Sequence, residues 1–347
     1  MATRRKPTRH RPRKPKPNAL VRYWRGLMAR LTPAMQRVAR IGLMAGIAAI
    51  AAAAGFVVAQ HFVDDPKPTQ SAQPARLPAK PAGKPRAAQA PPQQASIPRP
   101  PPALDAQQPA WLRFAVAAPP VPAGRPMIAI VIDDMGLDRP RSMRALDLAA
   151  PLTLSYLPYG KELPAQTALA RIRGHELMVH LPMEPMGEAN PGPDALLTGL
   201  SESELRRRIA AALSAFEGFV GINNHMGSKF TAWRPGMEIV VDEMKKRGLL
   251  FLDSRTSAQS VAAELANSAS VPNASRQVFL DDVLSSDNVW HQLAETEAIA
   301  RRNGYAIAIG HPHDNTLAAL AQWLPTLKEK GLALVPLTAI VRQRNGG

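Results

Sequence analysis

The chain has 347 residues, with 43 Lys and Arg against 27 Asp and Glu, and therefore a formal net charge of +16. It has no cysteine, which excludes a disulfide framework and a zinc site built on thiolates. The charge is uneven, because residues 1–40 contain 13 Lys and Arg and no acid. The high pI thus belongs to a tail, and we expect no nucleic-acid partner.

Residues 41–59 carry no charged side chain and consist mostly of Ala, Ile, Gly, Val and Leu. A helix needs about 20 such residues to cross a bilayer. The basic tail before the segment and Asp64-Asp65 after it place its N-terminus in the cytoplasm. The alternative is a cleaved signal peptide, whose apolar region would be only about 7–15 residues long. We predict a cytoplasmic tail at 1–40 and a retained single-pass anchor at 41–59 in the inner membrane, with the C-terminal domain in the periplasm or otherwise outside the cytoplasm.

Residues 60–124 are rich in Pro, Ala and Gln, as in the triplet at 100–102. A segment of this composition cannot bury a core and behaves as a semi-extended spacer. We therefore predict a disordered linker that holds the following domain away from the membrane.

The globular domain is predicted to cover 125–347. Strand-like runs rich in Val, Ile and Leu lie at 127–132, 152–157, 177–181, 219–222, 249–252, 277–280, 305–309 and 332–337. Helical stretches lie between them, at 201–216, 237–247, 289–303 and 316–330. Ser201 with Glu204 is typical of a helix start, and Gly248, Gly304 and Gly331 stand where helices end. This alternation predicts an α/β fold with a parallel sheet, closed into a barrel or doubly wound.

The first strand-like run, 127–132, is apolar without a break and is followed directly by Asp133 and Asp134. An unbroken run of this kind predicts a strand that is buried on both faces, as parallel strands are. The two carboxylates then lie at the carboxyl end of the strand, where α/β folds place their chemistry. Because adjacent carboxylates repel each other, a metal ion or a proton is expected to share the site.

Polar side chains follow most of the other predicted strands as well. Those that we take as candidates are His180, Glu184, Asn224, His225, Asp253, His311 and His313. The carboxyl ends of the strands of a barrel meet at one rim, so these side chains would share one cleft. A single histidine is more often structural, but polar groups after so many strands indicate a functional site.

This inventory suits metal-assisted hydrolysis. Neutral imidazoles and a carboxylate, with one position left open, form a catalytic zinc site. Asp134 and His180 are the first candidates for ligands, and either His225 or Glu184 would complete the set. A bound zinc ion lowers the pKa of water and polarises a carbonyl group.

Proton transfer requires two further groups. Asp133 is placed to act as the general base and His311 as the general acid that protonates the leaving amine. Glu184, Asn224, Asp253 and His313 remain candidates for substrate binding or for an alternative metal ligand. No serine-hydrolase elbow, Walker loop or dinucleotide fingerprint is present in the sequence.

At these positions the sequence resembles a known family. The stretch 131–134 is similar to the Asp-Asp motif of NodB-homology polysaccharide deacetylases, and 174–180 to the stretch that leads into their zinc motif. Residues 125–342 more closely resemble the divergent polysaccharide deacetylase (YibQ-like) family. The motifs shared with it are Ile-Asp-Asp-x-Gly, His-x-Pro-Met-Glu-Pro, Asn-Asn-His-Met-Gly-Ser, Leu-Asp-Ser and Gly-His-Pro.

The resemblance implies a distorted (β/α) barrel with one zinc ion per chain, or another divalent metal in its place. It also implies a substrate, an N-acetylated glycan of the cell envelope. In the family's pattern Asp133 is the base, Asp134 a metal ligand and His311 the acid.

The sequence departs from the deacetylase pattern at two points. Glu184 stands where a histidine is expected four residues after His180, and the usual Arg-Pro motif is replaced by residues 223–225. Two functions therefore stay open: a zinc-dependent deacetylase, favoured by Asp133, and a non-catalytic envelope protein that binds glycan or a cell-wall remodelling partner, favoured by the missing histidine.

Overall fold

The computed structural model describes residues 107–344. The predicted tail at 1–40 and anchor at 41–59 lie outside these residues. Within 107–344, none of the helices is both long and apolar enough to cross a membrane.

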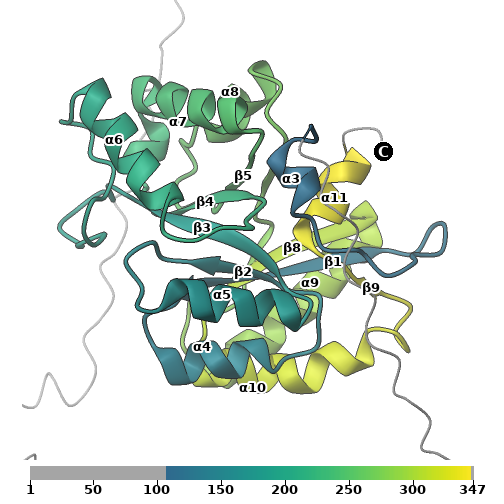
Figure 1. The fold of residues 1–347 in the computed structure, drawn as a ribbon. Coiled ribbons are helices and arrows are strands. Elements are labelled where there is room, and N and C mark those ends of the chain that lie inside the picture. The colour runs from purple at the N-terminus through teal and green to yellow at the C-terminus, as the bar shows by residue number, and fades with distance from the viewer. Residues whose placement is uncertain (1–106, 345–347) are drawn as a thin grey trace, which may run out of the picture. The chain divides into compact units, whose positions relative to one another are not determined.

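The described chain forms an α/β fold (Figure 1). The strands are β1 Met127–Met135, β2 Thr153–Tyr156, β3 Glu176–Met183, β4 Gly221–Met226, β5 Leu250–Asp253, β6 Asn273–Ser275, β7 Val278–Phe279, β8 Tyr305–Gly310 and β9 Ala333–Leu334. The helices are α3 Ala110–Arg113, α4 Arg139–Leu146, α5 Leu163–Ile172, α6 Glu202–Leu213, α7 Arg234–Arg247, α8 Ala262–Ser268, α9 Ser286–Asn303, α10 Asp314–Trp323 and α11 Leu337–Arg344. Two short 3-10 helices are η1 Phe230–Ala232 and η2 Leu324–Thr326.

All strands pair in parallel, in the order β6-β5-β4-β3-β2-β1-β8-β7, with β9 beside β1. The two end strands, β6 and β7, are separated by only two residues of the chain. Residues 273–279 thus form one extended segment that pairs first with β5 and then with β8. The prediction of a parallel α/β sheet is confirmed, and its barrel-like form is a curled sheet whose ends meet in that segment.

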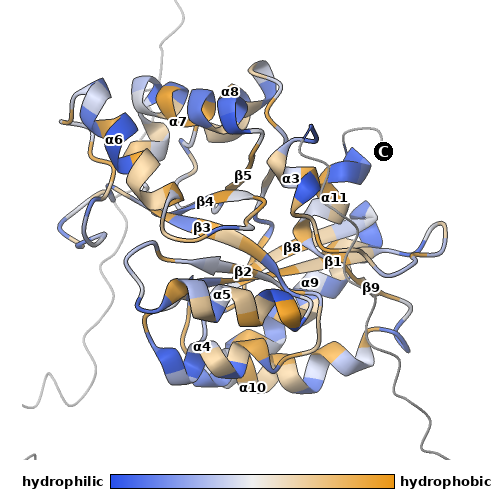
Figure 2. Cartoon of the chain, in the orientation of Figure 1, coloured by the Kyte–Doolittle hydropathy of each residue, from blue (hydrophilic) through white to orange (hydrophobic). Residues whose placement is uncertain are grey.

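Each face of the curled sheet packs against a separate apolar cluster. Along β1, Ile128, Ile130 and Ile132 pack with the outer helices, whereas Ala129 and Val131 belong to the cluster inside the curl. This is the two-sided burial that an unbroken apolar run predicts. Figure 2 shows mostly orange strands at the centre and helices around them that carry both blue and orange residues.

Helix α11 fills the end of the curl where the strands begin. Leu337, Ile340 and Val341 on this helix are fully buried in the inner cluster. The backbone N–H of Leu337 donates to Thr153 Oγ1 over 3.1 Å, which connects the helix to β2. The strand expected at 332–337 is therefore wrong beyond β9, because the chain turns into this helix.

The domain begins earlier than Arg125. Helix α3 packs against it through Trp111, which is only 9% exposed. The backbone N–H of Trp111 donates to the carbonyl of Gly248 over 2.9 Å. The assignment of residues 107–124 to a disordered linker is thus corrected, since Trp111 adds an aromatic ring to the inner cluster.

The helix signals of the sequence are largely confirmed. Ser201 accepts from the N–H of Glu204 at the start of α6, and Gly248 and Gly304 end α7 and α9 in the left-handed conformation. Helix α10 ends at Trp323, earlier than 330, because Pro325 interrupts it and the chain continues as η2. Helices α3, α4, α5, α8 and α11 were not predicted from the sequence.

Candidate metal centre and active site

The interior of the curl changes from apolar to polar along the strands. Because side chains alternate along a strand, every second residue faces inward. On β1 these residues are Ala129, Val131 and then Asp133, and β8 continues in the same way from Ile309 to His311. The inward side chains from β3 and β4 at this level are His180 and Asn223. Polar side chains thus lie together at the carboxyl ends of the strands, next to the apolar cluster inside the curl.

A β-bulge explains how two adjacent carboxylates reach one site. Between Ile132 and Met135 the pairing of β1 with β2 shifts by one residue, and Asp134 has a φ of 55°. Regular alternation would place Asp133 and Asp134 on opposite faces. The left-handed conformation at Asp134 instead lets both side chains line the same pocket, a strained arrangement typical of functional sites.

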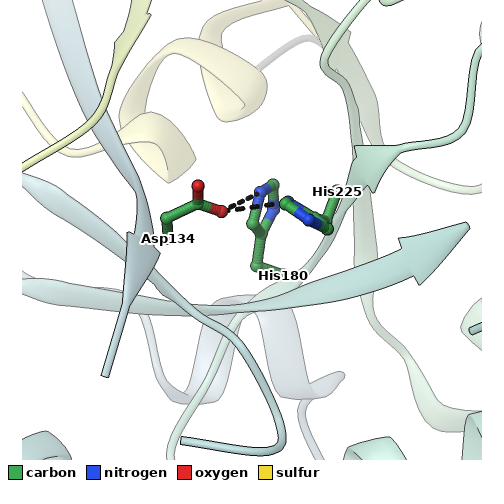
Figure 3. Close-up of side chains that lie close together, drawn as sticks. All are labelled: Asp134, His180 and His225. Carbon is green, nitrogen blue, oxygen red and sulfur yellow. Dashed lines mark ion pairs between the residues drawn. The ribbon is translucent and has the colours of Figure 1, made fainter. Parts of the chain in front are cut away.

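Asp134, His180 and His225 lie close enough to bind one metal ion, with their ligand atoms all within 4.8 Å of one another. Asp134 Oδ1 is 2.9 Å from His225 Nδ1 and 3.4 Å from His180 Nε2 (Figure 3). The three residues come from β1, β3 and β4. One carboxylate and two imidazoles form a ligand set of the kind used in catalytic zinc sites.

The ligand atoms of Asp134, His180 and His225 lie close together but do not satisfy one another with hydrogen bonds. Asp134 Oδ1 is buried and has no hydrogen-bond partner among the described residues, although two ring nitrogens lie beside it. Burial alone would raise the pKa of Asp134, but His180 and His225 outweigh it and hold the pKa below the ordinary value. Burial alone would lower the pKa of His180, but Asp133 and Asp134 raise it. The pocket therefore stabilises positive charge where a metal ion would lie.

The amide of Asn223 connects the base candidate to a ligand candidate. Its Nδ2 donates to both oxygens of Asp133, over 2.8 and 3.0 Å, so its Oδ1 must face His180. His180 Nδ1, 2.9 Å from this oxygen, is then the donor. The neutral ring consequently directs the lone pair of Nε2 toward Asp134, as a metal ligand requires.

Asp133 lies deeper than Asp134 and makes no close contact with His225. Its side chain is nearly inaccessible, and burial raises its pKa although His180 and His311 oppose the shift. A carboxylate with a raised pKa that is held by hydrogen bonds is suited to accept a proton.

His311 faces the same pocket from β8. Its Nδ1 is 2.9 Å from Asp281 Oδ1, and its backbone N–H donates to Asp281 Oδ2 over 2.7 Å. Burial alone would lower the pKa of His311, but Asp281 raises it to about 9. The ring is thus protonated at neutral pH, and its Nε2 lies 3.9 Å from Asp134 Oδ2.

A second group of possible ligands consists of Asp281, His311 and His313. Its member His311 lines the same pocket as the first group, and the Asp281 carboxylate already accepts hydrogen bonds from His311 and Thr316. His313 lies at the start of α10, with its ring centre 5.6 Å from that of His311. Asp281 therefore orients the His311 ring, and both oxygens of the Asp281 carboxylate already have hydrogen-bond partners.

The site opens into a pocket of about 260 Å³. Its lining consists of Asp133, Asp134, His180, Asn224, His225, Met226, Ser254, Thr256, Arg276, Phe279, Ile309 and His311. This volume is slightly below the range of about 300–1,000 Å³ that is usual for pockets that bind small molecules.

Two of the predicted site residues lie away from the possible metal ligands Asp134, His180 and His225. Glu184 accepts from Thr198 and forms a 2.6 Å ion pair with Lys229, so it anchors the loop after β3. Asp253 accepts from the N–H of Arg255 and from the hydroxyl of Ser260, and so shapes the loop after β5. The geometry places His225, not Glu184, beside Asp134 and His180.

Asn224 lines the pocket but serves mainly as a brace. Its Nδ2 donates to the carbonyl of Met226 over 2.8 Å, and its Oδ1 accepts from the N–H of Ser254 over 2.9 Å. The side chain thereby holds together the loops after β4 and β5.

Three residues of the site were not among the candidates from the sequence: Asn223, Asp281 and Arg276. The signal for Asn223 was available, because it stands two residues before His225 on a strand and must share its face. Asp281 likewise follows a predicted strand directly. No sequence pattern pointed to Arg276. It lies between β6 and β7, and only the pairing of these strands in the sheet shows that they form one segment beside the site.

The fold and the site define a class: a parallel, curled α/β domain with possible metal ligands and acid–base groups at the carboxyl ends of its strands. The profile of one protein family, described as divergent polysaccharide deacetylase, matches residues 130–341. The chain belongs to this family, in agreement with the sequence analysis.

Three proteins that are similar to this chain are described as uncharacterized. The protein YibQ of Escherichia coli is 36% identical over 208 residues, which are 60% of this chain and 65% of YibQ, just under two thirds of its length. A protein of Haemophilus influenzae is 33% identical over 202 residues, 58% of this chain and 72% of its own. A crystal structure from Agrobacterium tumefaciens C58 is 32% identical, covers 67% of this chain and 95% of that one, and superposes with a TM-score of 0.64.

Proposed function

We propose that the domain is a metal-dependent hydrolase that removes N-acetyl groups from a glycan of the cell envelope. The observation that carries the proposal is the buried Oδ1 of Asp134, which makes no hydrogen bond and lies 3.4 Å from His180 Nε2 and 2.9 Å from His225 Nδ1. Family membership supports the reaction class, and the pocket beside these residues provides room for an acyl group.

Asp134, His180 and His225 would hold the metal ion, and the fit of their donor atoms supports this assignment. When bound, a zinc or other divalent ion would supply Lewis-acid polarisation of the acyl carbonyl and make water more acidic. The donor set also suits zinc in its chemistry, because imidazole and carboxylate are both common zinc ligands.

The chain itself would move the protons. Asp133, held by the amide of Asn223, would take a proton from the attacking water. His311, held by Asp281, would donate a proton to the nitrogen that leaves. An amine leaves poorly without this proton, so the acid and the base act on opposite sides of the same scissile bond.

The proposal is tested by metal analysis of the purified protein together with measurement of acetate released from N-acetylated envelope glycans. We expect about one zinc ion per chain and release of acetate that stops when a chelator removes the metal. A protein that binds glycan with its metal in place, yet releases no acetate from any glycan tested, would instead be a non-catalytic binding protein.

We further propose that the domain works outside the cytoplasm, attached by the segment 41–59. The support is the uncharged segment itself, with its basic flank on one side only. Protease added to spheroplasts should then digest the domain and leave the N-terminal tail intact. A protected domain would contradict this orientation.

A further inference from the structure

One cation in the pocket has no role in the proposed proton transfers. Arg276 lines the pocket beside Phe279 and His311. Its guanidinium carbon stacks 4.7 Å above the centre of the Phe279 ring, and that ring centre is 5.6 Å from the ring of His311. Arg276 therefore lies on the side of the pocket where the leaving nitrogen would receive its proton.

The guanidinium of Arg276 is held in place by backbone groups. Its Nε donates to the carbonyl of Ser254 over 2.6 Å, and its Nη2 donates to the carbonyl of Arg255 over 2.9 Å. Within the described part of the chain, Nη1 has no hydrogen-bond partner. The side chain is thus rigid and has donors left for a ligand.

The charge of Arg276 is also not neutralised by a direct ion pair with any described residue. Asp133, Asp253 and Asp282 are its acidic neighbours, but each accepts hydrogen bonds from other groups. Arg255 is a second arginine close to it and opposes its charge. Arg255 makes no side-chain hydrogen bond or ion pair inside 107–344.

Two neighbouring arginines that lack a carboxylate partner, one of them fixed in a pocket, form an anion-binding arrangement. A half-buried, oriented guanidinium binds a carboxylate through short, charge-assisted hydrogen bonds. The hydrogen bonds that Arg276 makes to Ser254 and Arg255 are to neutral carbonyls, so they leave the charge of the guanidinium without a carboxylate partner.

We propose that Arg276 forms an anion subsite that selects substrates carrying a carboxylate next to the acylated amine. Resting on the proposed function, this inference narrows the substrate class from N-acetylated glycans in general to N-acetylated sugars with an acidic substituent near the acetamido group. The carboxylate would bind Nη1 of Arg276 while the acetamido group lies between the metal ligands and His311.

The test compares two probes that differ only in charge: N-acetylmuramic acid, whose ether-linked carboxylate is adjacent to its acetamido group, and its methyl ester. Their binding to the metal-loaded protein is measured by calorimetry. We expect the acid to bind at least about tenfold more tightly than the ester. The preference should disappear in Arg276→Gln and be partly retained in Arg276→Lys.

Arg301→Gln serves as the matched control, because Arg301 is an exposed arginine of α9 whose Nη2 likewise donates to a backbone carbonyl, that of Lys330. It should keep the full preference for the acid. Thermal melting of all three variants shows whether each is folded.

The outcomes separate this inference from the proposed function. Equal binding of acid and ester, or acetate release from neutral N-acetylglucosamine oligomers without binding of the acid, would refute the subsite and leave the hydrolase. Binding of the acid that depends on Arg276, with no acetate release from any glycan, would support the subsite and refute the hydrolase. If neither probe binds and no glycan is hydrolysed, both fail.

Discussion

The two ends of the curled sheet contain carboxylates that differ in their hydrogen bonds. At the carboxyl end, Asp134 has a buried oxygen without a hydrogen bond, next to two imidazoles, on a strained bulge. At the amino end, Glu176 is fully buried, and its oxygens accept from Thr153 and from both the N–H and the hydroxyl of Thr338. Helix α11 covers that end, whereas a pocket opens at the other. The difference shows which end is built for stability and which for a ligand.

The two ends of the sheet are therefore expected to respond differently to mutation. Changes at the carboxyl end should reduce metal binding or turnover while the fold is kept, and changes at the amino end should reduce stability while the site is kept.

Asp133→Asn should lower turnover by about 10²–10⁴-fold, the usual contribution of a general base. The amide can still accept from Asn223 through its oxygen, so metal content and melting temperature should stay close to wild type. Acetate release, zinc analysis and thermal melting measure the three quantities. The control is Asp147→Asn, a carboxylate whose side chain is 65% exposed; a loss of turnover caused only by unfolding would make Asp133 a structural residue.

His225→Ala should weaken zinc binding by more than about a hundredfold, because even residues behind the ligands contribute about 10–100-fold. Glu184→Ala should leave the zinc content unchanged, since Glu184 is bound to Thr198 and Lys229. Titration with a competing chelator measures both. The reverse result would make Glu184 the third ligand.

Ile340→Ala, at the amino end, should lower the free energy of unfolding by about 2–5 kcal/mol, because it leaves a cavity in the inner cluster. Ile172→Ala is the matched control, as that side chain is 82% exposed and should lose little. Urea unfolding measures the difference. Zinc content should be unchanged in both variants, and a loss of zinc in Ile340→Ala would show that the two ends are coupled.

Glu176→Gln should make stability less dependent on pH. Burial raises the pKa of Glu176 above its ordinary value of 4.5, although hydrogen bonds from Thr338 and Thr153 oppose the shift. The folded state therefore retains the proton longer than the unfolded state, and this contribution to stability is full below about pH 4.5 and is lost as the pH rises through the folded pKa. Over that window wild type should lose about 1.4 kcal/mol per pH unit relative to the variant. Parallel stability profiles from urea unfolding would contradict the prediction.

The sequence by itself determined the parallel α/β architecture and the position of most strands, because burial on both faces leaves an unbroken apolar run that can be read locally. It also indicated that polar residues after these strands gather at one rim, and among them Asp133, Asp134, His180, His225 and His311 line one pocket. Both inferences use periodicity within a few residues of the chain.

Only the tertiary structure decided how these residues face one another. The bulge that turns Asp134 into the pocket exists because β1 is paired with β2, and the amide that holds Asp133 comes from a residue 90 positions away. Helix α11 and Trp111 are held by the inner cluster, not by strong local signals. The segment that carries Arg276 became recognisable only when the curled sheet joined β5 to β8. Side-chain direction at such points depends on the register of distant strands, which local periodicity does not encode.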